Sequence, residues 1–121
     1  MEDTTRFLEK TLGYKRKSVP ANSPIEVRWL DIGNGQELHV LFVEGFVASP
    51  YEAEFGRHIA LFHPLKDLPG VRQRIVEAGG ELVEPMRSTS FQRLFFREPI
   101  NGYMFELIDV EQHRHLLAEQ L

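Results

Sequence analysis

The feature of this sequence that most limits its fold is an internal repeat of one helix followed by three strands. Helices are predicted over 3–12 and 67–78, because apolar residues recur on one face, an aspartate opens each stretch and glycine follows it. Asp3 and Asp67 stand 64 residues apart, whereas His39 and Glu106, in the last predicted strand of each half, stand 67 apart. Since this offset barely changes, we interpret the halves as copies of one unit.

The predicted strands occupy corresponding places in the two halves. Apolar-rich runs predict three strands after each helix, at 14–19, 26–32 and 37–43, and at 81–83, 91–97 and 103–108. Asn34-Gly35 between two such runs is typical of a hairpin turn. The second half has an additional opening strand at 57–63, whose counterpart would fall before Met1. We therefore expect an α+β fold of two modules, the first without its opening strand.

These assignments describe a single domain made of four segments. We expect module one over about 1–45 and module two over about 57–109. The stretch 44–56, which contains Pro50 and two glycines, breaks the pattern and is interpreted as a connector. Residues 110–121 are predicted to form a C-terminal helix, since Asp109 and Gln112 have the spacing of a capping box.

Composition excludes several classes of function. The chain of 121 residues carries 14 Lys and Arg against 18 Asp and Glu, and a net charge of −4 does not suit a partner made of phosphates. The absence of cysteine excludes thiolate catalysis and Cys-based metal sites. No apolar run is long enough for a membrane span, and the first 20 residues lack the apolar core of a signal peptide. We expect a cytoplasmic protein that binds neither nucleic acid nor membrane.

Motifs in the second half resemble those of the vicinal oxygen chelate superfamily, which includes glyoxalase I, fosfomycin-resistance proteins, bleomycin-binding proteins and extradiol dioxygenases. They are His58-Ile-Ala-Leu-Phe62, Glu77-Ala-Gly-Gly80, Phe95-Phe-Arg-Glu-Pro99, Asn101-Gly102 and Phe105-Glu-Leu-Ile-Asp109, in the family's order and spacing. The resemblance implies paired βαβββ modules that form a curved mixed sheet around a cavity. It also implies a homodimer, in which a second subunit covers the sheet edge that the absent strand leaves open.

The resemblance further implies a divalent metal, Fe, Mn, Zn or Ni, held by His39, His58 and Glu106. Strand alternation supports part of this set independently, because His58 shares a face with Ala60 and Phe62 and each candidate is a polar residue within an apolar-rich strand. In the family the opening strand supplies another ligand, so three protein ligands are expected here at best. Glu106 is also the candidate for moving protons in an isomerase-type reaction.

Other residues are assigned lesser roles. Arg93 is a candidate for binding an anionic group of the substrate, and Phe62, Met104 and Tyr51 are candidates for lining its site. His63 is separated from His58 by an odd number of positions and is expected on the opposite face of the strand. His113 and His115 are interpreted as solvated tail residues.

Two classes of function remain open from the sequence. The first is a metal-dependent enzyme that acts on a small molecule with vicinal oxygens, as a lyase, isomerase or dioxygenase. The second is a metal-free protein that sequesters a small compound, such as a drug, in an aromatic-lined cavity. The absent opening strand favours the second class, and the three polar strand positions favour the first.

Overall fold

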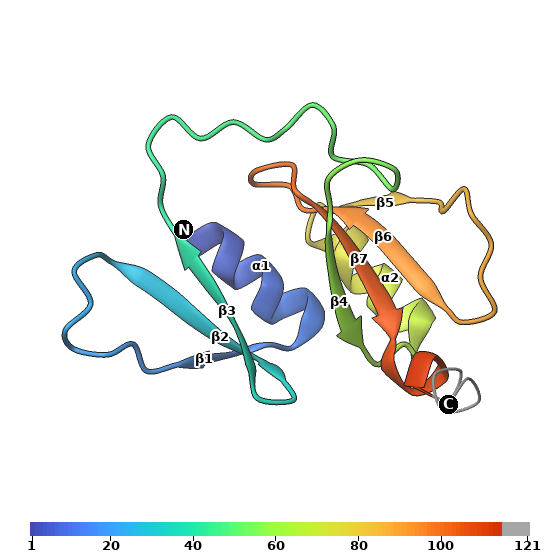
Figure 1. Ribbon diagram of the computed structural model, residues 1–121, viewed down its shortest axis with the longest axis horizontal. Coiled ribbons are helices and arrows are strands. Elements are labelled where there is room, and N and C mark those ends of the chain that lie inside the picture. The colour runs from blue at the N-terminus through green and yellow to red at the C-terminus, as the bar shows by residue number, and fades with distance from the viewer. Residues whose placement is uncertain (115–121) are drawn as a thin grey trace. The chain divides into compact units, whose positions relative to one another are not determined.

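The computed structural model describes residues 1–114 of the chain and divides it into two compact units, Met1–Val47 and Ala48–Leu121 (Figure 1). The first unit contains a helix and a three-stranded sheet. The second contains a helix and a four-stranded sheet. The α+β class predicted from the repeat is therefore confirmed. No helix within residues 1–114 is both long and apolar enough to cross a membrane.

The first unit follows the order helix, strand, strand, strand. Its elements are α1 (Glu2–Leu12), β1 (Lys15–Lys17), β2 (Val27–Gly33) and β3 (Gln36–Leu41). The strands form an antiparallel sheet in the order β1-β2-β3, and α1 packs against β2. The apolar face of α1 buries Phe7, Leu8 and Leu12, and the sheet buries Leu30 completely. The predicted helix and hairpin are both confirmed.

The hairpin between β2 and β3 depends on two residues with left-handed backbone. Asn34 has φ of 54° and Gly35 has φ of 73°. Two successive positive φ angles give a turn whose twist matches the twist of the paired strands, which is why Asn-Gly is favoured there. The turn sets the register that places His39 opposite Trp29.

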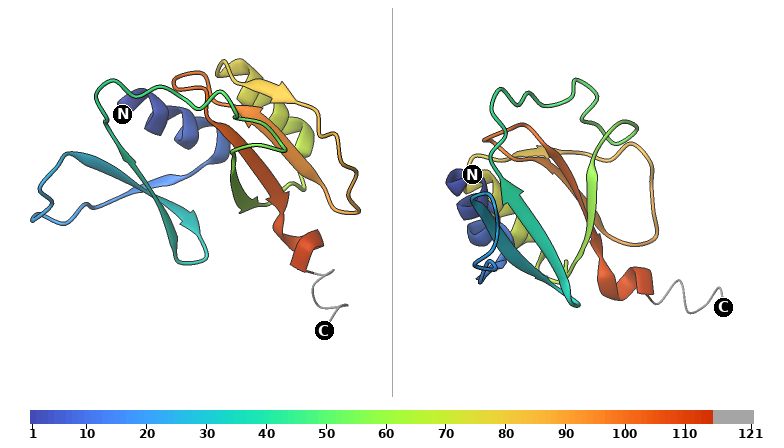
Figure 2. Two further views of the ribbon diagram at one scale, coloured as in Figure 1. Left: turned by 45° about the horizontal axis from the view of Figure 1, so that its top comes forward. Right: turned by 60° about the vertical axis from the view of Figure 1, so that its left-hand side comes forward.

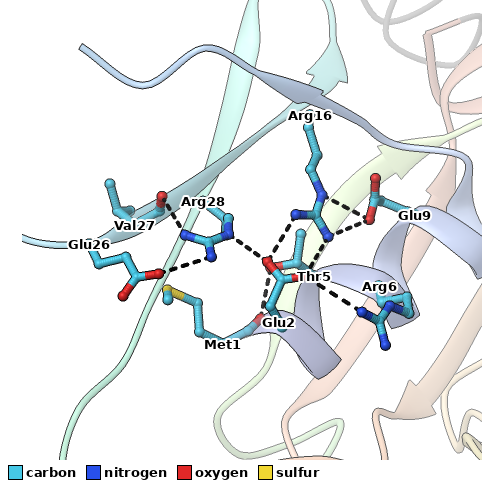
Figure 3. Close-up of polar contacts among 9 residues, drawn as sticks. All are labelled: Met1, Glu2, Thr5, Arg6, Glu9, Arg16, Glu26, Val27 and Arg28. Atoms are coloured by element: carbon cyan, nitrogen blue, oxygen red, sulfur yellow. Dashed lines mark hydrogen bonds and ion pairs between the residues drawn. The ribbon is translucent and has the colours of Figure 1, made fainter. Parts of the chain in front are cut away.

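Charged side chains tie α1 to the sheet of its own unit (Figure 3). The carboxylate of Glu2 accepts hydrogen bonds from Arg16 at 2.9 and 3.0 Å, and also from Arg28 on β2. Arg16 additionally binds Glu9 on the same helix. These contacts hold the pKa of Glu2 at about 2, mainly through the hydrogen bonds from Arg16 and then Arg28.

The predicted helix cap at Asp3 is wrong. The helix begins at Glu2, with Met1 at the capping position and no side-chain hydrogen bond there. Asp3 lies instead in the first turn, where its negative charge still interacts favourably with the helix dipole. At the other end, Gly13 has φ of 72° and its N–H donates to Glu9 O, as the sequence predicts for a glycine cap.

The second unit has one strand more, at its beginning. Its elements are β4 (Ile59–His63), α2 (Leu68–Glu77), β5 (Glu81–Val83), β6 (Arg93–Arg97) and β7 (Met104–Asp109). The strand order is β4-β7-β6-β5, with β4 parallel to β7 and the other pairs antiparallel. Figure 2 shows α2 running along one face of this sheet. The expected βαβββ order is confirmed here, as is αβββ in the first unit.

The core of the second unit lies between α2 and this sheet. Val71 and Ile75 of α2 are buried, as are the residues of β6 and β7 on the sheet face that this helix covers. Among these, Phe96 and its cross-strand partner Phe105 stack with ring centroids 5.3 Å apart. Asp67 caps α2 as predicted, since its side chain accepts the N–H of Gly70.

The predicted capping box at the C-terminal helix is not formed, although Asp109 does cap the helix. Residues 110–114 are helical, and Asp109 Oδ1 accepts the N–H of Glu111 at 3.3 Å. Gln112 does not complete the box, because its side chain accepts the N–H of Gln92 at 2.6 Å, while Asp109 N donates to Gln92 O. The remainder of the predicted helix, residues 115–121, lies outside the described residues.

Candidate functional site

The candidate site lies on the face of the four-stranded sheet opposite α2, with Glu106 at its centre. Glu106 is paired in register with Ala60 of β4 on one side and with Phe95 of β6 on the other. His58, one residue before β4, points to the same face, because its side chain reaches Glu106. The strand alternation predicted for His58 and Glu106 is thus confirmed, and the two side chains are in contact.

The imidazole of His58 is held at both nitrogens. Nε2 lies 3.0 Å from Oε1 of Glu106, and Nδ1 lies 3.1 Å from the carbonyl oxygen of Ala53. The ring also meets Phe95 edge to face, with centroids 5.5 Å apart. A carbonyl oxygen can only accept, so the proton on Nδ1 faces Ala53, and Nε2 is the nitrogen directed at Glu106.

Arg93 lies on the other side of Glu106 and is almost completely buried. Its NH1 donates to Glu106 Oε2 at 3.0 Å, and its NH2 contacts Glu54 Oε2 at 3.4 Å. The guanidinium also lies 5.1 Å from the centroid of the Phe95 ring, a cation–π distance. Its Nε has no hydrogen-bond partner among the described residues. Arg93 thus lies beside Glu106, the predicted catalytic residue. Its guanidinium pairs with two carboxylates of the protein, where the sequence predicted an anionic group of the substrate.

Glu54, from the stretch interpreted as a connector, joins this cluster. Its carboxylate accepts the backbone N–H groups of Met86 at 2.6 Å and Arg87 at 3.2 Å. The pKa of Glu54 is lowered, chiefly by the hydrogen bond from Met86. Sequence reasoning missed this residue because no periodicity marks an acid in an irregular segment, and because its partners lie more than 30 positions away.

The candidates for lining the site occupy different environments. Met104 is fully buried, and its N–H donates to the carboxylate of Glu52 at 2.7 Å. Phe62 is 47% exposed and Tyr51 is 73% exposed. Whether any of them contacts a substrate stays a prediction.

Two further histidines, His113 and His63, belong to the second unit. His113 is not a solvated tail residue, since its ring lies 5.3 Å from Phe62 and 5.1 Å from Phe91, with Nδ1 buried and unpaired among the described residues. The expectation is wrong because Gln92 and Gln112 attach residues 110–114 to β6. His63 lies on the α2 side as predicted, and burial together with Arg74 of α2 lowers its pKa.

His39 belongs to the first unit. On β3 it stacks on Trp29, with ring centroids 4.1 Å apart and an interplanar angle of 2°, and its Nε2 lies 3.0 Å from Glu37 Oε2. Glu37 also pairs with Lys17 of β1. Glu37 and His39 share a face as strand alternation requires, but the convergence of His39 with His58 and Glu106 stays a prediction.

The His58–Glu106 pair brings together two side chains of the kinds that bind a divalent metal. Imidazole nitrogen and carboxylate oxygen are ligands for Zn and Mn. Nε2 and Oε1 lie 3.0 Å apart, the distance of a direct hydrogen bond between the two side chains. Within neither unit do residues 1–114 gather three such groups, so the pair provides two of the three protein ligands that the resemblance implied.

Solved structures that resemble this chain share its fold at low identity. FosX fosfomycin resistance protein from Mesorhizobium loti is 20% identical, with a TM-score of 0.65 over 95% of this chain and 86% of that one. A mutant of FosX from Listeria monocytogenes, complexed with Mn(II) and 1S,2S-dihydroxypropylphosphonic acid, is 19% identical, with a TM-score of 0.68 over 93% and 87%. A putative glyoxalase family protein from Bacillus anthracis is 22% identical, with a TM-score of 0.69 over 89% and 82%.

The chain therefore has the fold of the vicinal oxygen chelate superfamily, as its motifs implied. No protein-family model and no curated protein matches it by sequence. Identities near 20% carry the fold alone, so the reaction has to be argued from the residues of the site.

Proposed function

We propose that this protein is a small-molecule enzyme that uses a divalent metal, held by His39, His58 and Glu106, to bind adjacent oxygens of its substrate. The observation that carries the proposal is the contact of His58 Nε2 with Glu106 Oε1, which brings two groups of metal-ligating chemistry together on one sheet face. The Mn(II) and the dihydroxy phosphonate in the Listeria FosX complex support the same class of chemistry. A bound metal would supply a Lewis acid that polarises substrate oxygens.

The chain's own residues would have distinct roles in such a reaction. Ala53 O orients the ring of His58 by accepting the proton of Nδ1, which leaves Nε2 free to act as a ligand. Glu106 would hold and move a proton through its carboxylate in a lyase, isomerase or dioxygenase type of reaction. Arg93 would orient an anionic group of the substrate through its unpaired Nε.

Metal content and affinity test this proposal. Protein purified without chelator is analysed by inductively coupled plasma mass spectrometry, and Mn²⁺ affinity is measured for His39→Ala, His58→Ala and Glu106→Ala. We expect about one metal per chain in the unsubstituted protein, with each substitution weakening Mn²⁺ by at least about tenfold. His63→Ala, a histidine on the α2 side of the same sheet, is the matched control and should leave the affinity unchanged.

The outcomes separate the ligands from the overall idea. If the unsubstituted protein binds no metal, the metal-dependent function is rejected. If it binds metal and Glu106→Ala binds equally well, the ligand set is wrong. The response of His39→Ala decides whether the two units share one site.

A metal-free binding protein is the second candidate, favoured by the contact between Arg93 and Glu106. The guanidinium already binds the carboxylate and packs on Phe95, so Glu106 has a cationic partner without a metal. In this case small aromatic or cationic compounds should raise the unfolding temperature in the presence of EDTA. A stabilisation that requires Mn²⁺ would contradict it.

A further inference from the structure

We infer that Glu54 is a positioning residue that balances the charge of Arg93, so that Glu106 stays available to a cation. This inference rests on the proposed metal-dependent function. It concerns a residue outside the predicted ligand set, and it accounts for a buried arginine beside a proposed metal ligand.

Arg93 lies where its positive charge would weaken the attraction of Glu106 for a metal ion. NH1 of Arg93 lies 3.0 Å from Oε2 of Glu106, while Oε1 of the same carboxylate faces His58. If Arg93 and Glu106 formed an isolated pair, their charges would cancel and the carboxylate would attract a divalent ion weakly. A guanidinium cannot lose its proton in a protein, so its charge has to be balanced by another group.

Glu54 supplies that second negative charge. Its Oε2 lies 3.4 Å from NH2 of Arg93, so two carboxylates share one guanidinium and the three groups together carry one net negative charge. The side chains of Glu54, Arg93 and Glu106 are only 8%, 3% and 9% exposed. At this burial water screens the charges little, and the balance has a large effect on ion binding.

The position of Glu54 does not depend on Glu106. Backbone N–H groups of Met86 and Arg87 donate to its carboxylate, and the carbonyl oxygen of Arg87 accepts from NH2 of Arg93. These backbone bonds keep Glu54 ionised, in agreement with the lowered pKa of its carboxyl. Arg87 and Glu54 therefore hold NH2 of Arg93, whereas Glu106 binds NH1.

Titration with Mn²⁺ alone, followed by electron paramagnetic resonance of the free ion, tests the charge balance. Glu54→Gln keeps the shape of the side chain and removes its charge, so the net charge of the three groups rises from −1 to zero. We expect Mn²⁺ binding to weaken by about tenfold. Glu84→Gln is the matched control, because Glu84 precedes the same segment and pairs with Arg72 at the surface. It should leave the affinity within about twofold.

A second variant separates charge from structure. In Glu54→Gln combined with Arg93→Met, the group again carries one negative charge, that of Glu106, and Mn²⁺ affinity should return to within about threefold of the unsubstituted protein. A purely structural role for Glu54 predicts that the double variant binds no better than Glu54→Gln. Arg93→Met alone keeps the test valid if Glu54→Gln does not fold, since it should bind Mn²⁺ at least as tightly as the unsubstituted chain.

The remaining outcomes separate failure of the proposed metal-dependent function from failure of the inference about Glu54. If the unsubstituted protein binds no Mn²⁺, the proposed function fails and the inference fails with it. If it binds Mn²⁺ and Glu54→Gln binds equally well, the proposed function stands and the inference is wrong. Loss of affinity in Arg93→Met would also overturn the inference, because Arg93 would then support the ion.

Discussion

At the scale of single residues, the second unit uses several buried acids for different purposes. Glu52 accepts the N–H of Met104 and pairs with Arg57. Glu54 and Glu106 share Arg93. Glu98, which is 1% exposed, has no cationic partner within residues 1–114 and binds backbone N–H groups instead. Burial of an acid therefore identifies a site only when its partners are known.

Glu98 should be essential for stability and irrelevant to metal binding. Its two oxygens accept the N–H groups of Ile100, Asn101 and Tyr103, which closes the turn between β6 and β7. Glu98→Gln places an NH₂ group against these donors and should cost about 1–3 kcal/mol in urea denaturation. Glu81→Gln, an exposed acid of the same sheet with a 3.3 Å surface pair to Arg97, should cost less than about 1 kcal/mol. Equal costs would mean that these backbone bonds contribute nothing.

At the scale of elements, two local features of the first unit control how its helix and hairpin are held. Charge pairs around Glu2 attach α1 to β2 (Figure 3). A turn with two left-handed residues, Asn34 and Gly35, joins β2 to β3. Trp29, the one tryptophan of the chain, lies on β2, so its fluorescence responds to changes in either feature. Each feature can therefore be tested by tryptophan fluorescence.

Glu2 should make the stability of the first unit depend on acid. The pKa of Glu2 is lowered from 4.5 to about 2, so its contribution is complete above pH 4.5 and is lost as the pH falls towards 2. Glu2→Gln should flatten this dependence in unfolding temperatures recorded between pH 2 and 6, and added salt should do the same in part because the pairs are exposed. Glu26→Gln, which removes the second acid on Arg28, should retain most of the dependence. An unchanged curve for Glu2→Gln would show that these pairs do not contribute to stability.

The hairpin turn should resist a side chain at Gly35. The backbone there has φ of 73°, and an added Cβ would meet nothing within 4 Å. The cost of Gly35→Ala is thus conformational, and about 1–2 kcal/mol is expected in urea denaturation followed by Trp29 fluorescence. Asn34→Gly, at φ of 54°, should change stability by less than about 0.5 kcal/mol. If Gly35→Ala is neutral, the turn does not have this conformation in solution.

At the scale of the whole molecule, the sheet of the first unit has its last strand, β3, at an edge. Within the described residues β3 has β2 as its single strand neighbour in that sheet, whereas β7 of the second unit has both β4 and β6. Exposed apolar side chains follow β3 directly, including Phe42 and Val47. Proteins normally cover such an edge, so a second copy of the chain remains the expected partner.

Sedimentation equilibrium at micromolar concentration tests the homodimer. We expect twice the 14.0 kDa of one chain, and Val47→Asp should weaken the dimer if the connector lies in the interface. Val76→Asp, an exposed position on α2, is the control and should have no effect. A mass of one chain would exclude the dimer. Leu116, Leu117 and Leu121 of the predicted C-terminal helix, apolar residues that could add to such an interface, lie outside the described residues.

The sequence by itself determined the order of the elements and the faces of the strands. Apolar periodicity, aspartate and glycine at helix ends, and Asn34-Gly35 are local signals, and they predicted α2 and the hairpin. The convergence of His58 and Glu106 was implied by the family resemblance, with strand alternation as support. Only the tertiary structure decided how the buried charges are distributed. Glu54 meets Arg93 across 39 positions and His58 meets Glu106 across 48, and no local pattern specifies such pairs. The burial of His113 was decided in the same way, because it depends on where Gln92 lies in the folded chain.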